Sequence, residues 1–145
     1  MEEIREITAT ETHTVRHPVL RAGKPIETCI FEGDEKEDNI HLGYFINSAL
    51  VGIASLYHQS HPELKAKNAY QLRGMAVLSH HQGHGYGEAL VNESLEKVQV
   101  NNGDLLWCNA RIKSVPFYKK MGFEVFGSPF DIGDIGTHYV MYHQL

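Results

Sequence analysis

Three glycines lie at alternate positions in the segment SHHQGHGYGEAL, where an apolar stretch gives way to an amphipathic one. They are Gly83, Gly85 and Gly87. A helix N-terminus leaves its first backbone N–H groups unpaired and carries partial positive charge, and glycines let an anion reach those donors without meeting a Cβ atom. The pattern predicts a phosphate or pyrophosphate site. A tight turn that only packs the helix on its sheet is the structural alternative.

Other phosphate-binding motifs fit this segment poorly. A P-loop needs Gly-Lys-Ser/Thr, whereas Glu88, Ala89 and Leu90 follow Gly87. A dinucleotide-binding turn needs the spacing GxGxxG, and the spacing here is GxGxG. The lysine and the further segments that accompany a protein-kinase glycine loop do not occur in the sequence.

The glycines must be positioned by a strand before them and a helix after them. A run rich in β-forming residues covers 69–77, and apolar residues on one face predict a helix over 83–101. A short buried strand is predicted at 105–110, which completes a βαβ unit. The site would therefore lie at the end of the first strand of that unit.

The other elements form a mostly antiparallel arrangement. A turn at Asn47 and Ser48 predicts a hairpin. Further expectations are a first strand around Ile4 and Ile7, a helix from Thr10 or Thr12 to Leu20, a long loop over 21–38, hairpin strands at 41–47 and 49–58, a brief helix at 114–122, and strands at 123–126 and 137–143. The fold class predicted is α+β, with a mixed, mostly antiparallel central sheet and flanking helices.

Composition limits the function classes. The chain has 145 residues, of which 42% are hydrophobic and 21% charged, as expected for one globular domain over 1–145. Its net charge of −5 and the acidic run EGDEKED argue against a nucleic acid partner. We expect no membrane or targeting segment and a cytoplasmic location. Cys29 and Cys108, far apart in apolar surroundings, are expected to be buried reduced thiols.

Two motifs together resemble the GCN5-related N-acetyltransferase (GNAT) family. Gln82, Gly85 and Gly87 match its pyrophosphate-loop pattern Q/R-x-x-G-x-G/A, and PFYKKMGF matches a second segment with an FY pair, a basic residue and GF. The stretches NARIKSVPFYKKMGF and IGTHYVM are similar to the branch of the family related to ElaA. The resemblance covers about residues 40–145 and implies an acyl-CoA N-acyltransferase fold.

The resemblance also implies how acetyl-CoA would bind as co-substrate. Main-chain groups of Met75, Ala76 and Val77 would pair with the pantetheine arm, with the Val77 N–H near the thioester oxygen. The pyrophosphate would meet main-chain donors, with Gln82 at the start of the loop. The full set of expected cofactor-binding residues is Met75, Ala76, Val77, Gln82, Gly83, His84, Gly85, Tyr86, Gly87, Asn109, Phe117 and Tyr118.

The only basic cluster lies beside this expected site. It comprises Arg111, Lys113, Lys119 and Lys120. It either neighbours a phosphate or forms a solvated helix face.

The implied reaction is direct attack of an amine on the acetyl thioester, so neither cysteine is needed as a nucleophile. Tyr118 would protonate the leaving thiolate, unless it is only an aromatic residue packed on the sheet. Glu27, His41 and His138 are candidates for the base, and each has a purely structural alternative. His138 ranks first because its IGTHYVM setting is similar to the closing strand of the family branch.

The expected partner is a primary amine of a small molecule or peptide, with no nucleic acid and no membrane, and a homodimer is left open. Ten histidines are present, but the sequence has neither Cys partners nor an HExxH motif, so no metal site is predicted. The alternative function is a catalytically silent module that binds acyl-CoA for sensing.

Overall fold

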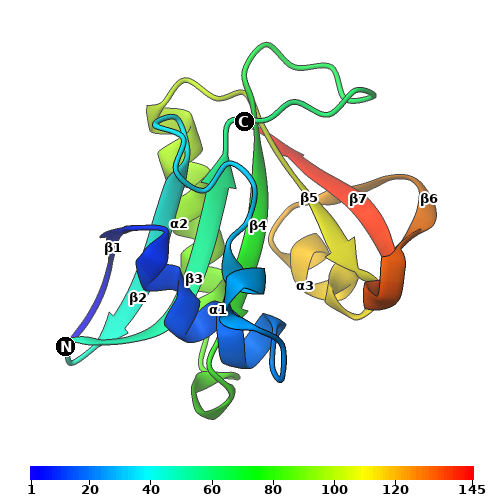
Figure 1. The fold of residues 1–145 in the computed structure, drawn as a ribbon. Coiled ribbons are helices and arrows are strands. Elements are labelled where there is room, and N and C mark those ends of the chain that lie inside the picture. The colour runs from blue at the N-terminus through cyan, green and yellow to red at the C-terminus, as the bar shows by residue number, and fades with distance from the viewer.

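The structure is a computed structural model that describes residues 1–145. Its seven strands form one sheet in the order β1-β2-β3-β4-β5-β7-β6 (Figure 1). The strands are β1 (Glu2–Ile7), β2 (Ile40–Ile46), β3 (Ala49–Tyr57), β4 (Ala69–Val77), β5 (Leu105–Arg111), β6 (Glu124–Ile132) and β7 (Gly136–Gln144). The helices are α1 (His13–Leu20), α2 (Tyr86–Val100) and α3 (Val115–Lys120). All neighbouring strands except β4 and β5 are antiparallel, which confirms the predicted fold class.

The β2–β3 hairpin follows directly from its turn residues. Asn47 and Ser48 have φ values of 48° and 73°, and Ile46 lies opposite Ala49. Two consecutive residues with positive φ match the right-handed twist of the flanking strands, and asparagine tolerates that conformation. The hairpin prediction is confirmed.

The sheet divides between β4 and β5. These two strands pair in parallel only from Ala69 opposite Leu105 to Gln71 opposite Trp107. Beyond this point β4 continues along β3 while β5 continues along β7, and Figure 1 shows the two strands diverging. The divergence leaves the inner edges of β4 and β5 without a partner strand. The candidate functional site lies in this opening.

A β-bulge bends β4 where the divergence begins. The pairing with β3 shifts between Ile53 and Ser55, and Gly74 in β4 has a φ of 61°. A Cβ atom on Gly74 would lie 3.2 Å from the ring of Phe31 and 3.5 Å from Arg16 Nε. Glycine is therefore required here both by the left-handed backbone and by close packing.

Two hydrophobic clusters cover opposite faces of β4. The larger cluster joins the sheet to α2 and α3 and includes Leu72, Leu90 and Tyr118. The smaller one lies beneath α1 and includes Val15 and Ala76. In Figure 1 α1 accordingly lies in front of the sheet and α2 behind it. Each face of β4 therefore supplies a different set of side chains to the site.

The structure differs from the sequence expectations at two places. Helix α2 begins at Tyr86 rather than at residue 83, because Gly83 and Gly85 have φ values of 82° and 84° that no helix can contain. Strand β6 extends to Ile132 rather than ending at 126. Its register shifts between Phe126 and Phe130, and an edge strand tolerates both this bulge and Pro129.

The other predicted helices and strands agree closely with the structure. A 3-10 turn (Thr10–Thr12) leads into α1, which contains Pro18, and the stretch 21–38 holds only one further 3-10 turn, Ile26–Cys29. Both cysteines are free and buried, as expected. No helix reaches the length and apolarity needed to cross a membrane.

Candidate active site

A cavity of about 280 Å³ lies where β4 and β5 separate. Met75 of β4, Asn109 of β5, Tyr118 of α3 and His138 of β7 line it. The end of α1 and the loop that carries Phe31 close it on the other face of the sheet. Two catalytic candidates and several residues of the expected cofactor site thus meet in one place.

The main chain at the end of β4 presents a donor to the gap beside β5. The Leu78 N–H donates to the Val51 carbonyl of β3 at 2.9 Å. Because the direction of these groups alternates along a strand, the N–H and C=O of Val77 point away from β3, toward the gap beside β5. The side-chain amide of Gln82 donates to the Val77 carbonyl at 2.8 Å. Gln82 therefore ties the glycine loop to the end of β4, and the Val77 N–H faces the gap.

The glycine loop exposes a continuous row of backbone donors. None of the N–H groups of residues 83–88 donates a hydrogen bond within the protein, and the first helical bond runs from the Ala89 N–H to the Gly85 carbonyl at 3.1 Å. A Cβ atom on Gly83 or Gly85 would meet nothing within 4 Å, so the outer side of the loop is open. Together with the partial positive charge at the start of α2, this row is suited to a diphosphate.

Tyr118 presents its hydroxyl to the cavity. The residue is 8% exposed, and its hydroxyl makes no hydrogen bond within the protein. The ring packs edge-on against Phe117 and Phe123, with centroid distances of 5.1 and 5.3 Å. Burial, and to a lesser extent the neighbouring Cys108, raise the pKa of Tyr118. The hydroxyl therefore stays protonated at neutral pH and can act as a donor.

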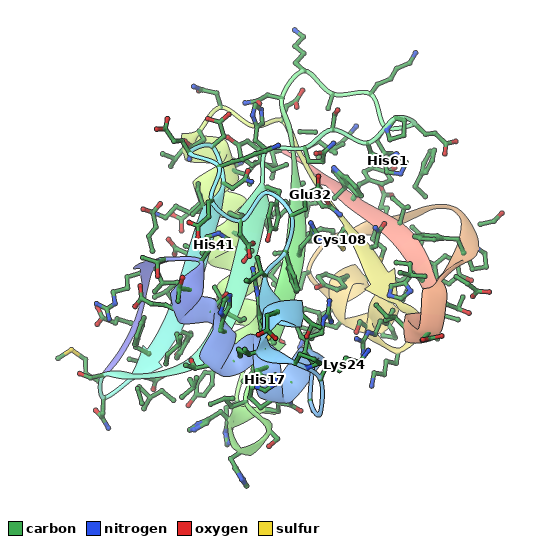
Figure 2. All side chains as sticks on the ribbon, in the orientation of Figure 1. His17, Lys24, Glu32, His41, His61 and Cys108 are labelled. Atoms are coloured by element: carbon green, nitrogen blue, oxygen red, sulfur yellow. The ribbon has the colours of Figure 1, made fainter.

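Cys108, labelled in Figure 2, lies on β5 and also lines the cavity. Burial raises the pKa of its thiol to about 12. A neutral, buried thiol is a poor nucleophile. This agrees with a direct transfer that uses no covalent enzyme intermediate.

His138 has the geometry of a base. It is 4% exposed and lies opposite Arg111 in the β5–β7 ladder. Its Nδ1 is 2.8 Å from the Gly136 carbonyl. Because a carbonyl can only accept, Nδ1 carries the proton, and Nε2 of the neutral ring has a free lone pair.

The other two base candidates are not brought to this cavity. His41, labelled in Figure 2, is buried and uses both ring nitrogens: Nε2 donates to the Asp34 carbonyl at 2.8 Å, and Nδ1 accepts from Ser55 Oγ at 2.7 Å. These contacts favour the structural role for His41. Glu27 is exposed in the Ile26–Cys29 turn and does not line the cavity. Sequence spacing could not separate these residues from His138, since all three lie far from the glycine loop along the chain.

The basic cluster divides in the structure. Arg111 lines the cavity, whereas Lys120 Nζ forms an exposed ion pair with Glu88 Oε1 at 2.6 Å, next to the glycine loop. Lys113 and Lys119 are exposed. The cluster is therefore not one phosphate-binding patch.

Sequence reasoning missed the residues on the α1 side of the cavity, namely Arg21, Phe31 and Arg73. Phe31 belongs to a short apolar patch, Cys29 to Phe31, in an otherwise polar loop. Arg73 follows the apolar Leu72 in β4, so strand alternation places it on the opposite face. Neither signal is specific enough to reveal a site without the fold.

A buried ion pair holds the loop that carries Phe31. Arg16 Nη1 lies 2.7 Å from Asp34 Oδ2, and Arg16 Nη2 lies 3.1 Å from Asp34 Oδ1. Arg16 also donates to the Cys29 carbonyl, and the Phe31 N–H donates to Asp34 at 2.9 Å. Burial raises the pKa of Asp34, but the hydrogen bonds from Arg16, Tyr57 and the Phe31 N–H outweigh it and lower that pKa overall. The loop is thus anchored through α1.

Comparison with known proteins agrees with this geometry. The family model described as "Acetyltransferase (GNAT) family" matches residues 1–123. A curated relative from Bacillus subtilis (strain 168), "Uncharacterized N-acetyltransferase YitI", is 39% identical over 145 residues, which cover 100% of this chain and 97% of the relative. The chain therefore belongs to the GNAT acetyltransferase family, and the family predicted from the two motifs is confirmed.

Solved structures share the fold at low sequence identity. Escherichia coli ElaA aligns with a TM-score of 0.79 and 19% identity, over 99% of this chain and 100% of ElaA. An N-acetyltransferase from Lactobacillus plantarum aligns with a TM-score of 0.80 and 14% identity, over 99% of this chain and 98% of that one. An aminoglycoside 6'-N-acetyltransferase complexed with coenzyme A aligns with a TM-score of 0.78 and 14% identity, over 98% of this chain and 96% of that one. These likenesses confirm the acyltransferase fold.

Proposed function

We propose that the protein transfers the acetyl group of acetyl-CoA to a primary amine of a small molecule or peptide by direct attack. The observation that carries this proposal is the continuity of two features. The unpartnered edge of β4 is followed, after the short 3-10 turn Ser79–His81, by the free N–H groups of residues 83–88. An elongated molecule with amides at one end and a diphosphate at the other fits this surface.

The diphosphate of acetyl-CoA would bind the N–H groups of the loop, including those of His84 and Tyr86. Charge-assisted hydrogen bonds are worth about 1.5–3 kcal/mol each before ordering costs, so four or five of them can supply much of a micromolar affinity. The amide-bearing arm would pair with the main chain of Met75 and Val77 along the strand edge. Ala76, also expected to pair with it, lies opposite Ile53, and the same alternation turns its N–H and C=O toward β3. Phe117 lies beside the loop. Its ring is 3.7 Å from the position that a Cβ atom added to Gly87 would occupy, which is an ordinary van der Waals distance. Asn109 is an exposed residue of β5 on the same cavity.

The residues of the cavity would then divide the proton transfers. An alkylamine with a pKa near 10.4 costs about 4–5 kcal/mol to deprotonate at pH 7, so a base is needed, and His138 Nε2 is free to accept the proton. The Val77 N–H would stabilise negative charge on the thioester oxygen. The Tyr118 hydroxyl would donate its proton to the departing thiolate.

The test is free-thiol release from acetyl-CoA with a panel of amines, combined with calorimetric titration of coenzyme A. We expect Tyr118→Phe to keep coenzyme A affinity and to lower kcat by about tenfold or more, because general acid catalysis is worth that much. Tyr70→Phe is the matched control: Tyr70 is a buried tyrosine of the same core cluster that does not line the cavity.

Unchanged turnover in Tyr118→Phe would remove the acid role from this residue. Coenzyme A binding with no thiol release from any amine would favour the silent sensing module instead. Absence of coenzyme A binding would refute the proposal as a whole.

A further inference from the structure

The charge of the cavity is opposite to that of the chain. The chain holds 18 Asp and Glu residues against 13 Lys and Arg, yet the cavity is lined by Arg21, Arg73 and Arg111 and by no aspartate or glutamate. The three arginines come from the end of α1, from β4 and from β5, so the tertiary fold concentrates them. This concentration of positive charge calls for a negatively charged occupant.

None of these arginines has a carboxylate partner in the protein. The ion pairs of the chain are Arg16–Asp34, His58–Asp38 and Lys120–Glu88. Arg21 donates one bond to the Leu20 carbonyl at 3.0 Å, and the guanidinium groups of Arg73 and Arg111 make no hydrogen bond. All three are partly buried. Their remaining N–H donors therefore face the cavity or solvent without a protein acceptor.

Phe31 organises two of these guanidinium groups in advance. The Cζ atoms of Arg21 and Arg73 lie 5.0 and 5.3 Å from the centre of its ring, and Arg73 Cζ is also 4.9 Å from the ring of Tyr57. Stacking on aromatic rings holds a guanidinium in place at low desolvation cost. Phe31 is itself fixed through Asp34. Arg21 and Arg73 thus both border the Phe31 ring at one end of the cavity, as does the ion-paired Arg16, at 3.9 Å.

This pair lies on the other face of the sheet from Tyr118. Leu72 and Tyr118 belong to the core beneath α2 and α3, and Arg73, adjacent to Leu72, projects toward α1. The glycine loop opens α2 on the first face. The Arg21–Arg73 pair is therefore separated from the donors that suit the diphosphate, and it suits a second anion.

We propose that the amine acceptor carries a carboxylate, which Arg21 and Arg73 bind while the amino group faces His138. This inference rests on the proposed acetyl transfer and specifies its substrate class as small amino acids or similar amino carboxylates. Arg–carboxylate pairs are short, charge-assisted and often bidentate, so they fix orientation as well as affinity. A polyamine or aminoglycoside would meet three guanidinium groups and no carboxylate.

The experiment compares L-amino acids with their carboxamides in the thiol-release assay, with spermidine and kanamycin as polycationic probes. The amide loses the proton of its amino group more readily, so any intrinsic bias favours the amide. We expect kcat/KM for at least one amino acid to exceed that of its amide by about tenfold or more, as for a desolvated charge pair. Arg73→Gln and Arg21→Gln should abolish this ratio by raising KM for the amino acid, with KM for acetyl-CoA unchanged.

Arg5→Gln is the matched control, because Arg5 also stacks on a phenyl ring, Phe45, at 4.0 Å, but lies on β1, outside the cavity. It should leave both substrates unaffected. Three results would overturn the inference: equal kcat/KM for amino acids and their amides, a preference for the polycations, or an equal loss of kcat/KM on both substrates in Arg73→Gln.

Failure of all amines would count against the proposed transfer, and saturation-transfer NMR then tests the subsite separately. Carboxylate-dependent binding of the amino acids that is lost in Arg73→Gln would support the subsite. Binding that is absent, or indifferent to the carboxylate, would refute it.

Discussion

The two sides of the cavity are built differently. The side suited to the cofactor consists of main-chain groups from the free edge at the end of β4 and from residues 83–88, whose N–H groups have no acceptor within the protein. The α1 side consists of side chains such as Arg21, Phe31 and Arg73, which belong to separate elements. Substitutions should therefore affect the first side through backbone conformation and the second through side-chain contacts and their supports.

The largest effect is expected from Asp34→Asn, which leaves Arg16 buried without its charge partner. Breaking a buried ion pair on one side costs about 3–5 kcal/mol. Chemical denaturation should show a loss of this size in the free energy of unfolding. KM for the acceptor should rise because Phe31 loses its anchor, while coenzyme A affinity changes little. Glu35→Gln, an exposed acid in the same loop, is the control, and a similar loss there would contradict this view.

The same carboxylate predicts a pH dependence. The pKa of Asp34 is lowered in the folded protein, so its stabilising contribution is complete above the unfolded value of about 3.9 and is lost as the pH falls through the lower folded value. The stability advantage of the wild type over Asp34→Asn should therefore shrink below about pH 4. Paired unfolding curves from pH 6 to pH 2.5 measure it. An advantage that is constant over this range would exclude the ion pair as its source.

On the cofactor side, Gly85→Val should lower coenzyme A affinity by about tenfold or more while the fold survives. A branched residue is strained at a φ of 84° and would project from the open side of the loop, where the anion should lie. Gly127→Val is the matched control for strain, since Gly127 has a φ of 74° and equally open surroundings on β6, away from the loop. Calorimetry and thermal melting compare the two. Retained affinity in Gly85→Val would refute the phosphate role.

His138→Gln addresses the base. Glutamine keeps a polar side chain of similar length but cannot accept the proton of the amine. We expect kcat/KM for the amine to fall by about tenfold or more, because general base catalysis is worth at least that much. Steady-state thiol release is the measurement. Unchanged kcat/KM in His138→Gln would remove the base role from this residue.

The smallest effect is expected from His84→Ala. His84 is exposed in the glycine loop, and its expected contribution is a backbone N–H that alanine also supplies. Coenzyme A affinity should change by less than about threefold, well under the value of one charge-assisted hydrogen bond. Calorimetry compares the coenzyme A affinity of this variant with that of Gly85→Val. The comparison shows whether the loop binds through its backbone or through its side chains. A tenfold loss in His84→Ala would make the loop a side-chain site and erase the contrast between the two sides.

The cofactor side could be predicted from sequence because its determinants are local. Glycines that require positive φ, a strand before them and an amphipathic helix after them are all encoded within residues 69–101. Local encoding also explains why the hairpin at Asn47 and Ser48 was predicted correctly. The boundaries at Tyr86 and Ile132 were less accurate, because bulges and left-handed residues shift an element without changing its composition.

The α1 side could not be predicted, because contacts between residues 16, 31, 34, 73 and 138 exist only once the chain is folded. His41 and His138 illustrate the difficulty. Both are buried strand histidines. Both ring nitrogens of His41 have hydrogen-bond partners within the protein, whereas Nε2 of His138 has none. No spacing rule separates them, since the difference lies in their neighbours in space.

The sequence alone thus determined the α+β fold class, the acetyltransferase family and the glycine loop at the start of α2. Each of these depends on residues that lie close together in the chain. Tertiary structure decided which histidine faces the cavity, which arginines gather there and how Arg16 and Asp34 support them. The physical reason is that side-chain pKa values, ion pairs and cavity charge depend on distance in space, whereas backbone conformation depends mainly on neighbours in sequence.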